Sequence, residues 1–135
     1  MSLSRIFEIS STAIAAQSQR LNVVASNLAN ADSVAGPDGA AYKARHVLFE
    51  ARQPVRADGV SGVRISGIVE DSTPGKRSYD PKHPQADAEG FVTSSNVNAV
   101  EEMVNMIAAS RSYQNNVEVL NTTQQLLLKT LQLGQ

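Results

Sequence analysis

The fold is decided by residues 96–133, which read NVNAVEEMVNMIAASRSYQNNVEVLNTTQQLLLKTLQL. The part from 97 to 133 contains neither glycine nor proline, and Gly134 follows where the residue that ends a helix is expected. With Asn98 as the N-cap, Glu101 occupies the third helical position, and Glu101 and Glu102 both lie at the positive end of the helix dipole. The sequence therefore predicts one long C-terminal helix that opens at Asn98.

Apolar residues recur along this segment at alternating steps of four and three residues. From Ala99 these steps meet eight apolar residues in ten positions, and from Leu3 they meet six in eight. Residues 3–30 also lack glycine and proline. A spacing of about 3.5 residues is typical of coiled-coil helices, so a second long helix is predicted at the N-terminus.

The two predicted helices are long for a chain of 14.4 kDa. At about 1.5 Å per residue they would extend for roughly 55 Å and 42 Å. Residues 3–30 carry only Arg5, Glu8 and Arg20 as charges, whereas a solvated coiled coil carries acids and bases beside its seam. This neutral surface favours a helix buried among other helices in an assembly, and a helix that is simply soluble stays open as the alternative.

The middle of the chain has a different composition. All five prolines and seven of the eight glycines lie between residues 36 and 90, as do most of the charged side chains. Segments 42–50 and 62–70 alternate partly between apolar and polar residues, and turn signals at 36–39, 58–59 and 73–75 bound them. These patterns predict a small antiparallel sheet or a pair of hairpins.

The fold class predicted is mainly α, with two long terminal helices forming a coiled-coil-like pair around a small β- and turn-rich region. The boundaries expected are residues 1–31 for the N-terminal helix, 32–95 for the middle region and 96–135 for the C-terminal helix.

Composition excludes several classes of function. Twelve basic residues and thirteen acidic ones give a formal net charge of −1, and the basic residues are spread among the acids, so neither a nucleic-acid site nor a membrane-surface site is indicated. The absence of cysteine removes disulfides and thiolate chemistry. No cleaved secretory signal and no membrane span is visible.

Few residues suggest catalysis. Asp80, His83 and Asp87 could offer ligands to a divalent cation, but Pro81 and Pro84 hold that segment extended, so carboxylates capping backbone N–H groups are the favoured interpretation. The sequence has no G-x-S-x-G, P-loop or G-x-G-x-x-G motif. We expect no enzyme, cofactor or small-molecule substrate; a small metallohydrolase would need the side chains of His46 and His83 brought together.

Several motifs resemble those of the bacterial flagellar axial proteins. The N-L-A-N element at residues 27–30 is shared by rod and hook proteins, while the D-P-K-H-P segment at 80–84 and N-V-N-A-V-E-E-M at 96–103 resemble the proximal rod subunits. The match is closest to one proximal rod subunit, and the neighbouring rod subunit of similar size is the alternative. The resemblance covers nearly the whole chain, and its motif residues are Asn27, Asn30, Asp80, Pro81, His83, Pro84, Asn96, Asn98, Glu101 and Glu102.

The resemblance implies a structural protein of the flagellar basal body. Such a subunit would be exported unfolded by the flagellar type III apparatus, would polymerise helically with itself and other rod proteins near the inner-membrane ring, and would transmit torque and line the export channel. The residues then expected to pack within and between subunits are Leu3, Phe7, Ile14, Leu21, Val24, Leu28, Met103, Met106, Tyr113, Val117, Leu120, Leu127 and Leu131.

Two features depart from the family pattern. Ser95 stands where a proline is common, and residues 35–40 look like an insertion. We expect Ser95 to loosen the loop that enters the last helix, and we expect Asn27 and Asn30 to form hydrogen bonds where the first helix ends. A cytoplasmic coiled-coil adaptor is the remaining alternative, although it should carry charged residues beside its seam.

Overall fold

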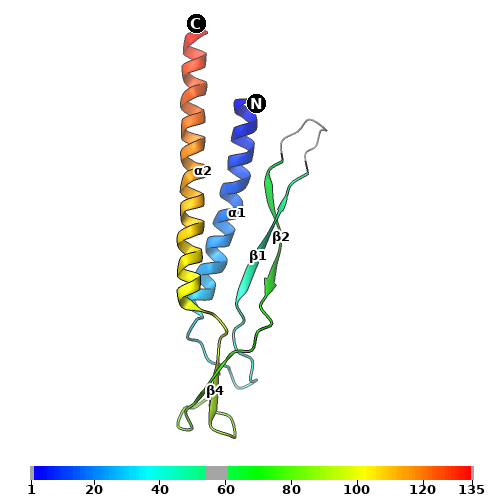
Figure 1. The fold of residues 1–135 in the computed structure, drawn as a ribbon, viewed down its shortest axis with the longest axis vertical. Helices are drawn as coiled ribbons and strands as arrows, with labels where there is room; N and C mark the ends of the chain where they lie inside the picture. Colours follow the sequence, from blue (N-terminus) through cyan, green and yellow to red (C-terminus); the bar gives the residue numbers. More distant parts are fainter. Residues whose placement is uncertain (1, 54–60, 135) are drawn as a thin grey trace.

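The computed structural model describes residues 2–53 and 61–134. Two long helices run in opposite directions, so that both ends of the chain lie at the same end of the molecule (Figure 1). The elements are α1 (Leu3–Ala29), β1 (Arg45–Ala51), β2 (Val63–Glu70), β3 (Lys76–Tyr79), β4 (Phe91–Ser94) and α2 (Ala99–Leu133). Two terminal helices with a strand-containing middle are as predicted; the turn expected at 58–59 lies outside the described residues.

The helix ends follow local side-chain chemistry. Asn98 Oδ1 accepts hydrogen bonds from the backbone N–H groups of Val100 and Glu101, at 3.2 Å and 3.3 Å, so the predicted N-cap of α2 is confirmed. At the end of α1, Asn30 Nδ2 donates to the Ser26 carbonyl at 2.8 Å. α2 ends at Leu133, immediately before Gly134 as predicted.

The strands form two separate antiparallel pairs. β1 pairs with β2, with a bulge between Leu48 and Phe49, and β3 pairs with β4. The first pair lies along α1, where the Val63 backbone N–H donates to Thr12 Oγ1 at 3.2 Å. α1 therefore lies between α2 on one side and the β1–β2 pair on the other (Figure 1). The second pair lies beyond the base of the helices and places Tyr79 edge-on to Phe91.

The buried core is small and consists of small residues. Its apolar members include Ala16, Val24, Val97 and Ala109, while the buried polar residues include Ser10 and Thr123. Many large apolar side chains of α2 remain exposed in the single chain. The chain itself therefore leaves much of the apolar surface of α2 uncovered.

Ser95 tightens the loop that enters α2, so the expectation that it loosens this loop is wrong. The residue is fully buried, its hydroxyl donates to the Ala31 carbonyl at 2.7 Å, and its backbone N–H donates to the Ser33 carbonyl at 3.0 Å. Its Oγ also accepts from the Val97 N–H at 3.3 Å. The serine side chain supplies hydrogen bonds between the end of α1 and the start of α2 that a proline could not make.

Replacing Ser95 with alanine should lower the free energy of unfolding by about 1–3 kcal/mol, because the Ala31 carbonyl and the Val97 N–H would lose a buried partner. Chemical denaturation followed by circular dichroism measures this change. Ser72, an exposed serine, provides the control: Ser72→Ala should leave the unfolding midpoint in place. Equal midpoints for Ser95→Ala and the unaltered chain would show that these bonds contribute nothing.

Candidate assembly surface and motif cluster

Asn27 is the centre of a hydrogen-bond network that joins three parts of the chain. Its side chain is 0% exposed. Oδ1 accepts from the Tyr42 hydroxyl at 2.9 Å and from the Arg45 N–H at 3.0 Å. Nδ2 donates to the Arg45 carbonyl at 2.8 Å and to Glu102 Oε2 at 3.0 Å. Both amide hydrogens and both lone pairs of the oxygen are thus used, which only asparagine's amide allows at this position.

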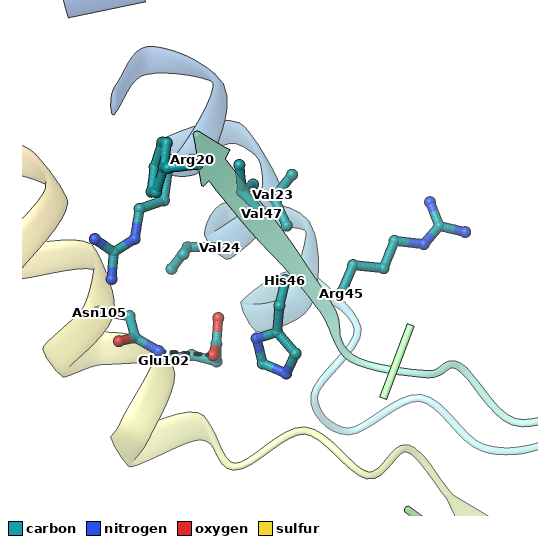
Figure 2. Close-up of a pocket in the computed structure, with 9 residues that line it drawn as sticks. Arg20, Val23, Val24, Arg45, His46, Val47, Glu102 and Asn105 are labelled. Carbon is teal, nitrogen blue, oxygen red and sulfur yellow. Dashed lines mark hydrogen bonds between the residues drawn. The ribbon is translucent and has the colours of Figure 1, made fainter. Parts of the chain in front are cut away.

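Glu102 is the α2 partner in this network. It is 4% exposed, and its second oxygen accepts from Asn105 Nδ2 at 3.0 Å. Arg20, His46 and Glu102 line a pocket of about 280 Å³ beside α1 and β1, with Val24 and Val47 in its wall (Figure 2). The sequence assigned Glu102 only to the start of the helix; its place in the pocket depends on Asn27 and could not be predicted from local pattern.

Asn96 makes the equivalent connection to the middle region. Its Oδ1 accepts from the Ala44 N–H at 2.7 Å, and its Nδ2 donates to the carbonyls of Asp71 and Thr73, at 3.1 Å and 2.9 Å. Asn27, Asn96, Asn98 and Glu102 therefore gather at the base of the two helices, which we call the motif cluster. The cluster fixes how the helices and the middle region meet.

The other motif residues lie away from this cluster. Asp80, Pro81, His83 and Pro84 belong to the connection between β3 and β4. Asp80 Oδ1 accepts from the Lys82 N–H and His83 Nδ1 from the Gln85 N–H, at 3.3 Å and 3.0 Å. The Asp80 carboxylate caps a backbone N–H group, as predicted. The expectation that Pro81 and Pro84 hold this segment extended is wrong, because the segment folds into successive turns in which the His83 N–H donates to the Asp80 carbonyl at 3.1 Å and the Ala86 N–H to the His83 carbonyl at 3.0 Å. In the described part of the chain, no three histidine or acidic side chains are grouped so that they could hold a metal ion.

Asp87 closes this connection. Its Oδ1 accepts from the backbone N–H groups of Phe91 and Glu89, at 2.8 Å and 3.0 Å, and Arg77 pairs with its other oxygen at 3.0 Å. The Phe91 N–H contributes most to lowering the pKa of Asp87 below its ordinary value of 3.8, against some opposing desolvation. Gly90, with a φ of +83°, makes the turn that brings Phe91 back toward Asp87.

The lowered pKa gives this turn a pH dependence of known sign. A carboxylate whose pKa falls on folding stabilises the turn above its unfolded pKa, and that contribution is lost as pH falls through the folded value. The Phe91 amide resonance should therefore titrate with a midpoint below 3.8. Asp87→Asn should abolish this transition, and a midpoint at or above 3.8 in the unaltered chain would contradict it.

The thirteen predicted seam residues differ in burial within the single chain. Val24 is buried. The half-buried members are Leu3, Ile14, Leu21, Leu28, Met106, Tyr113, Val117 and Leu120, and the exposed ones are Phe7, Met103, Leu127 and Leu131.

The most buried side of α2 passes through Glu102, Ala109 and Thr123. Each of these residues precedes by one residue a position reached by the four-and-three steps from Ala99, namely Met103, Ser110 and Gln124. The difference arises because hydrophobic periodicity gives no weight to buried polar or small side chains.

The open end of the helix pair carries an apolar hollow. Leu3, Phe7, Thr123 and Leu127 are among the residues that line this hollow of about 590 Å³. Several further leucines near the end of α2 are exposed. An exposed apolar surface of this kind is typical of a protein–protein contact. In the described residues, no helix combines the length and the hydropathy needed to span a bilayer.

Comparisons with known proteins identify the family. The model for flagella basal body rod proteins matches residues 7–37, and the model for the C-terminal part of the flagellar basal body rod FlgEFG proteins matches residues 88–133. The flagellar basal-body rod protein FlgC of Yersinia enterocolitica is 57% identical over the full length of both chains. The FlgC proteins of Escherichia coli O157:H7 and of Buchnera aphidicola from Acyrthosiphon pisum are 55% and 47% identical, again over both full lengths. The chain therefore belongs to the FlgC family of flagellar basal-body rod proteins.

Proposed function

We propose that the chain is a structural subunit of the proximal rod, in which the terminal segments 1–31 and 96–135 polymerise and the middle region 32–95 is carried beside them. The observation that carries this proposal is the apolar surface of α2, which the single chain leaves exposed at Met103 and Leu131. Such a surface is costly in a protein that acts alone, because apolar area in water opposes solubility. Family membership supports assembly with other rod proteins and favours a structural role over an enzymatic one.

The two helices are proposed to form a coiled-coil-like pair whose thirteen seam residues pack partly within the subunit and partly against its neighbours. Helical repetition of one unsymmetrical contact produces a filament. The subunits would thereby transmit torque and line the export channel. The full-length similarity to FlgC proteins favours this subunit over the neighbouring rod protein FlgB, and the family disfavours a cytoplasmic adaptor.

The partners proposed beyond the rod are the export apparatus, which would deliver the unfolded chain without a cleaved signal, and components of the inner-membrane ring.

The neutral polar face of α1 supports burial among other helices, since serine, threonine, asparagine and glutamine cost less to desolvate than ionised groups.

Complementation tests the proposed function. The chain should restore swimming in an Escherichia coli strain that lacks its own FlgC, and electron microscopy of the isolated basal bodies should show complete rods. A strain given the empty vector controls for reversion. Stable production of the chain without restored rods would contradict the proposal.

Amide hydrogen exchange should distinguish the hydrogen-bonded motif cluster at the base of the helix pair from the opposite end of the pair, where the chain termini lie. In dilute monomer we expect slow exchange around Asn27 and Glu102, whose side chains are buried and hydrogen-bonded. Residues 3–8 and 124–133 should exchange at least about a hundredfold faster, because few buried contacts hold those turns. Uniform strong protection of α1 and α2 would contradict the view that packing with neighbours completes the helix pair.

A further inference from the structure

Just before β2 begins, the β1–β2 hairpin comes very close to α1. A Cβ atom placed on Gly62 would lie 2.6 Å from Thr12 Oγ1 and 3.1 Å from the Thr12 methyl group. Cβ atoms essentially never approach another atom below 3.0 Å, so a larger residue at this position would displace the hairpin or the Thr12 side chain. The contact therefore depends on the missing side chain of Gly62.

Gly62 supplies space and not an unusual backbone conformation. Among the described residues, positive φ angles occur only at Gly39 and Gly90. Gly67, which lies within β2, has open space around it, because no atom beyond its chain neighbours comes within 4 Å of a Cβ placed there. The close approach to α1 thus distinguishes Gly62 from the other described glycine of this hairpin.

The Thr12 hydroxyl bonds to both elements. Its Oγ1 donates to the Ile9 carbonyl within α1 at 2.8 Å and accepts from the Val63 N–H at 3.2 Å. The one hydroxyl hydrogen is used within α1, and a lone pair of the oxygen faces the hairpin. Rotating the Thr12 side chain away from Gly62 would break both bonds. Thr12 and Gly62, which we call the clasp, therefore fit together in shape and in hydrogen bonding.

Side-chain packing around the clasp is open. Hollows of about 370 Å³ and 310 Å³ adjoin it, and Val63 lines both. Where α1 lines these hollows it carries small residues such as Ala13 and Ala16. A single pair of strands is only marginally stable without packing against another element. The position of the hairpin along α1 therefore rests on the clasp and on the hydrogen bonds between Asn27 and Arg45.

We propose that the clasp is the positioning element that holds the β1–β2 hairpin along α1, and that the hairpin keeps this position in the assembled rod. Asn27 lies 15 residues after Thr12, or about 22 Å along α1, so the hairpin is attached at two well-separated points. The statement about the rod rests on the proposed function. It adds that neighbouring subunits meet an α1 whose one side is already covered by its own hairpin.

Amide hydrogen exchange of the purified chain tests the clasp. Gly62→Ala should raise the exchange rate of the Val63 amide at least about tenfold, because the added methyl group displaces the acceptor Thr12 Oγ1. Gly67→Ala is the matched control in the same hairpin, and it should leave this rate unchanged because its methyl group enters open space. Equal rates in Gly62→Ala and the unaltered chain would overturn the clasp.

A double variant shows whether the two residues act through each other. Thr12→Ala removes the hydroxyl and methyl groups that crowd position 62, and should itself speed exchange of the Val63 amide. Adding Gly62→Ala to Thr12→Ala should then change the rate by less than about twofold, since residues in contact have non-additive effects. A further rise as large as that of Gly62→Ala alone would mean that the residues act separately, and would overturn the clasp.

A disulfide tests whether the hairpin stays docked in the rod. The Cβ placed on Gly62 lies 3.3 Å from Thr12 Cβ, close to the about 3.8 Å typical of disulfides, and the chain has no cysteine of its own. A chain carrying Thr12→Cys and Gly62→Cys should form this bond within one copy. In cells that lack their own FlgC, the locked chain should restore swimming equally with and without a reductant in the medium. Non-reducing electrophoresis of isolated basal bodies shows whether the bond is present.

The outcomes separate this inference from the proposed function. Failure of the unaltered chain to restore rods overturns the proposed function. Where the unaltered chain restores them, a locked chain that does so only after reduction, or not at all, overturns docking of the hairpin in the rod, because the subunit then needs the hairpin to leave α1.

Discussion

Replacing Asn27 with aspartate is expected to lower the free energy of unfolding by about 3–5 kcal/mol, although the two side chains have nearly the same shape. The change replaces the amide nitrogen with an oxygen that faces the Arg45 carbonyl and the Glu102 carboxylate, 2.8 Å and 3.0 Å from the present nitrogen. The new oxygen, the Arg45 carbonyl and the Glu102 carboxylate would then face one another as three buried hydrogen-bond acceptors without a donor between them. Since small domains are stable by about 5–15 kcal/mol, much of the chain would unfold under mild denaturant. Urea unfolding followed by circular dichroism measures the change.

Asn30 supplies the matched control, because it belongs to the same N-L-A-N element and makes the same kind of bond. Its amide donates to the Ser26 carbonyl at 2.8 Å at the partly exposed end of α1. Asn30→Asp should therefore cost only about 1 kcal/mol. Similar losses for the two variants would show that the buried network around Asn27 is no more important than a helix-end bond.

The contrast between these two asparagines shows what the sequence could predict. The end of α1 near Asn30 and the N-cap Asn98 follow from local sequence signals. The extent of each helix follows from the absence of glycine and proline within it. Hydrogen bonding by both asparagines at that end is confirmed. The full set of bonds made by Asn27 was not predictable, because its partners Tyr42, Arg45 and Glu102 are up to 75 residues away.

The same dependence on contacts between distant parts of the chain explains two differences from the predictions: which side of α2 is buried, and what Ser95 does in its loop. The predicted seam coincides with half-buried residues at Met106, Tyr113 and Leu120, which are apolar and recur at the helical period. The buried row through Glu102 and Thr123 is polar, and hydrophobic periodicity assigns such residues to the outside. The expectation for Ser95 fails for a related reason. Comparing serine with proline considers only the stiffness of the backbone, whereas the Ser95 hydroxyl donates a hydrogen bond to the carbonyl of Ala31, 64 residues earlier.

Replacing Leu120 with aspartate should block rod assembly while leaving a soluble chain. Leu120 is half-buried, three residues before the buried Thr123 and well removed along α2 from the motif cluster. A carboxylate there would oppose packing of the helix pair by about 1–3 kcal/mol in each subunit. This cost arises in the part of the helix pair that neighbouring subunits are proposed to complete. The hydrogen bond between Asn27 and Glu102 still joins α1 to α2 at the base of the pair.

The control for this prediction is Val119→Asp, which introduces the same charge one residue earlier at an exposed position. In the complementation strain, Leu120→Asp should abolish swimming and Val119→Asp should retain most of it, with equal amounts of soluble protein. Because adjacent residues point about 100° apart on a helix, the pair separates the effect of position from the effect of charge. Normal swimming with Leu120→Asp would exclude the proposed packing of α1 and α2 in the rod, whereas loss with both variants would place a second contact on the side of α2 that carries Val119.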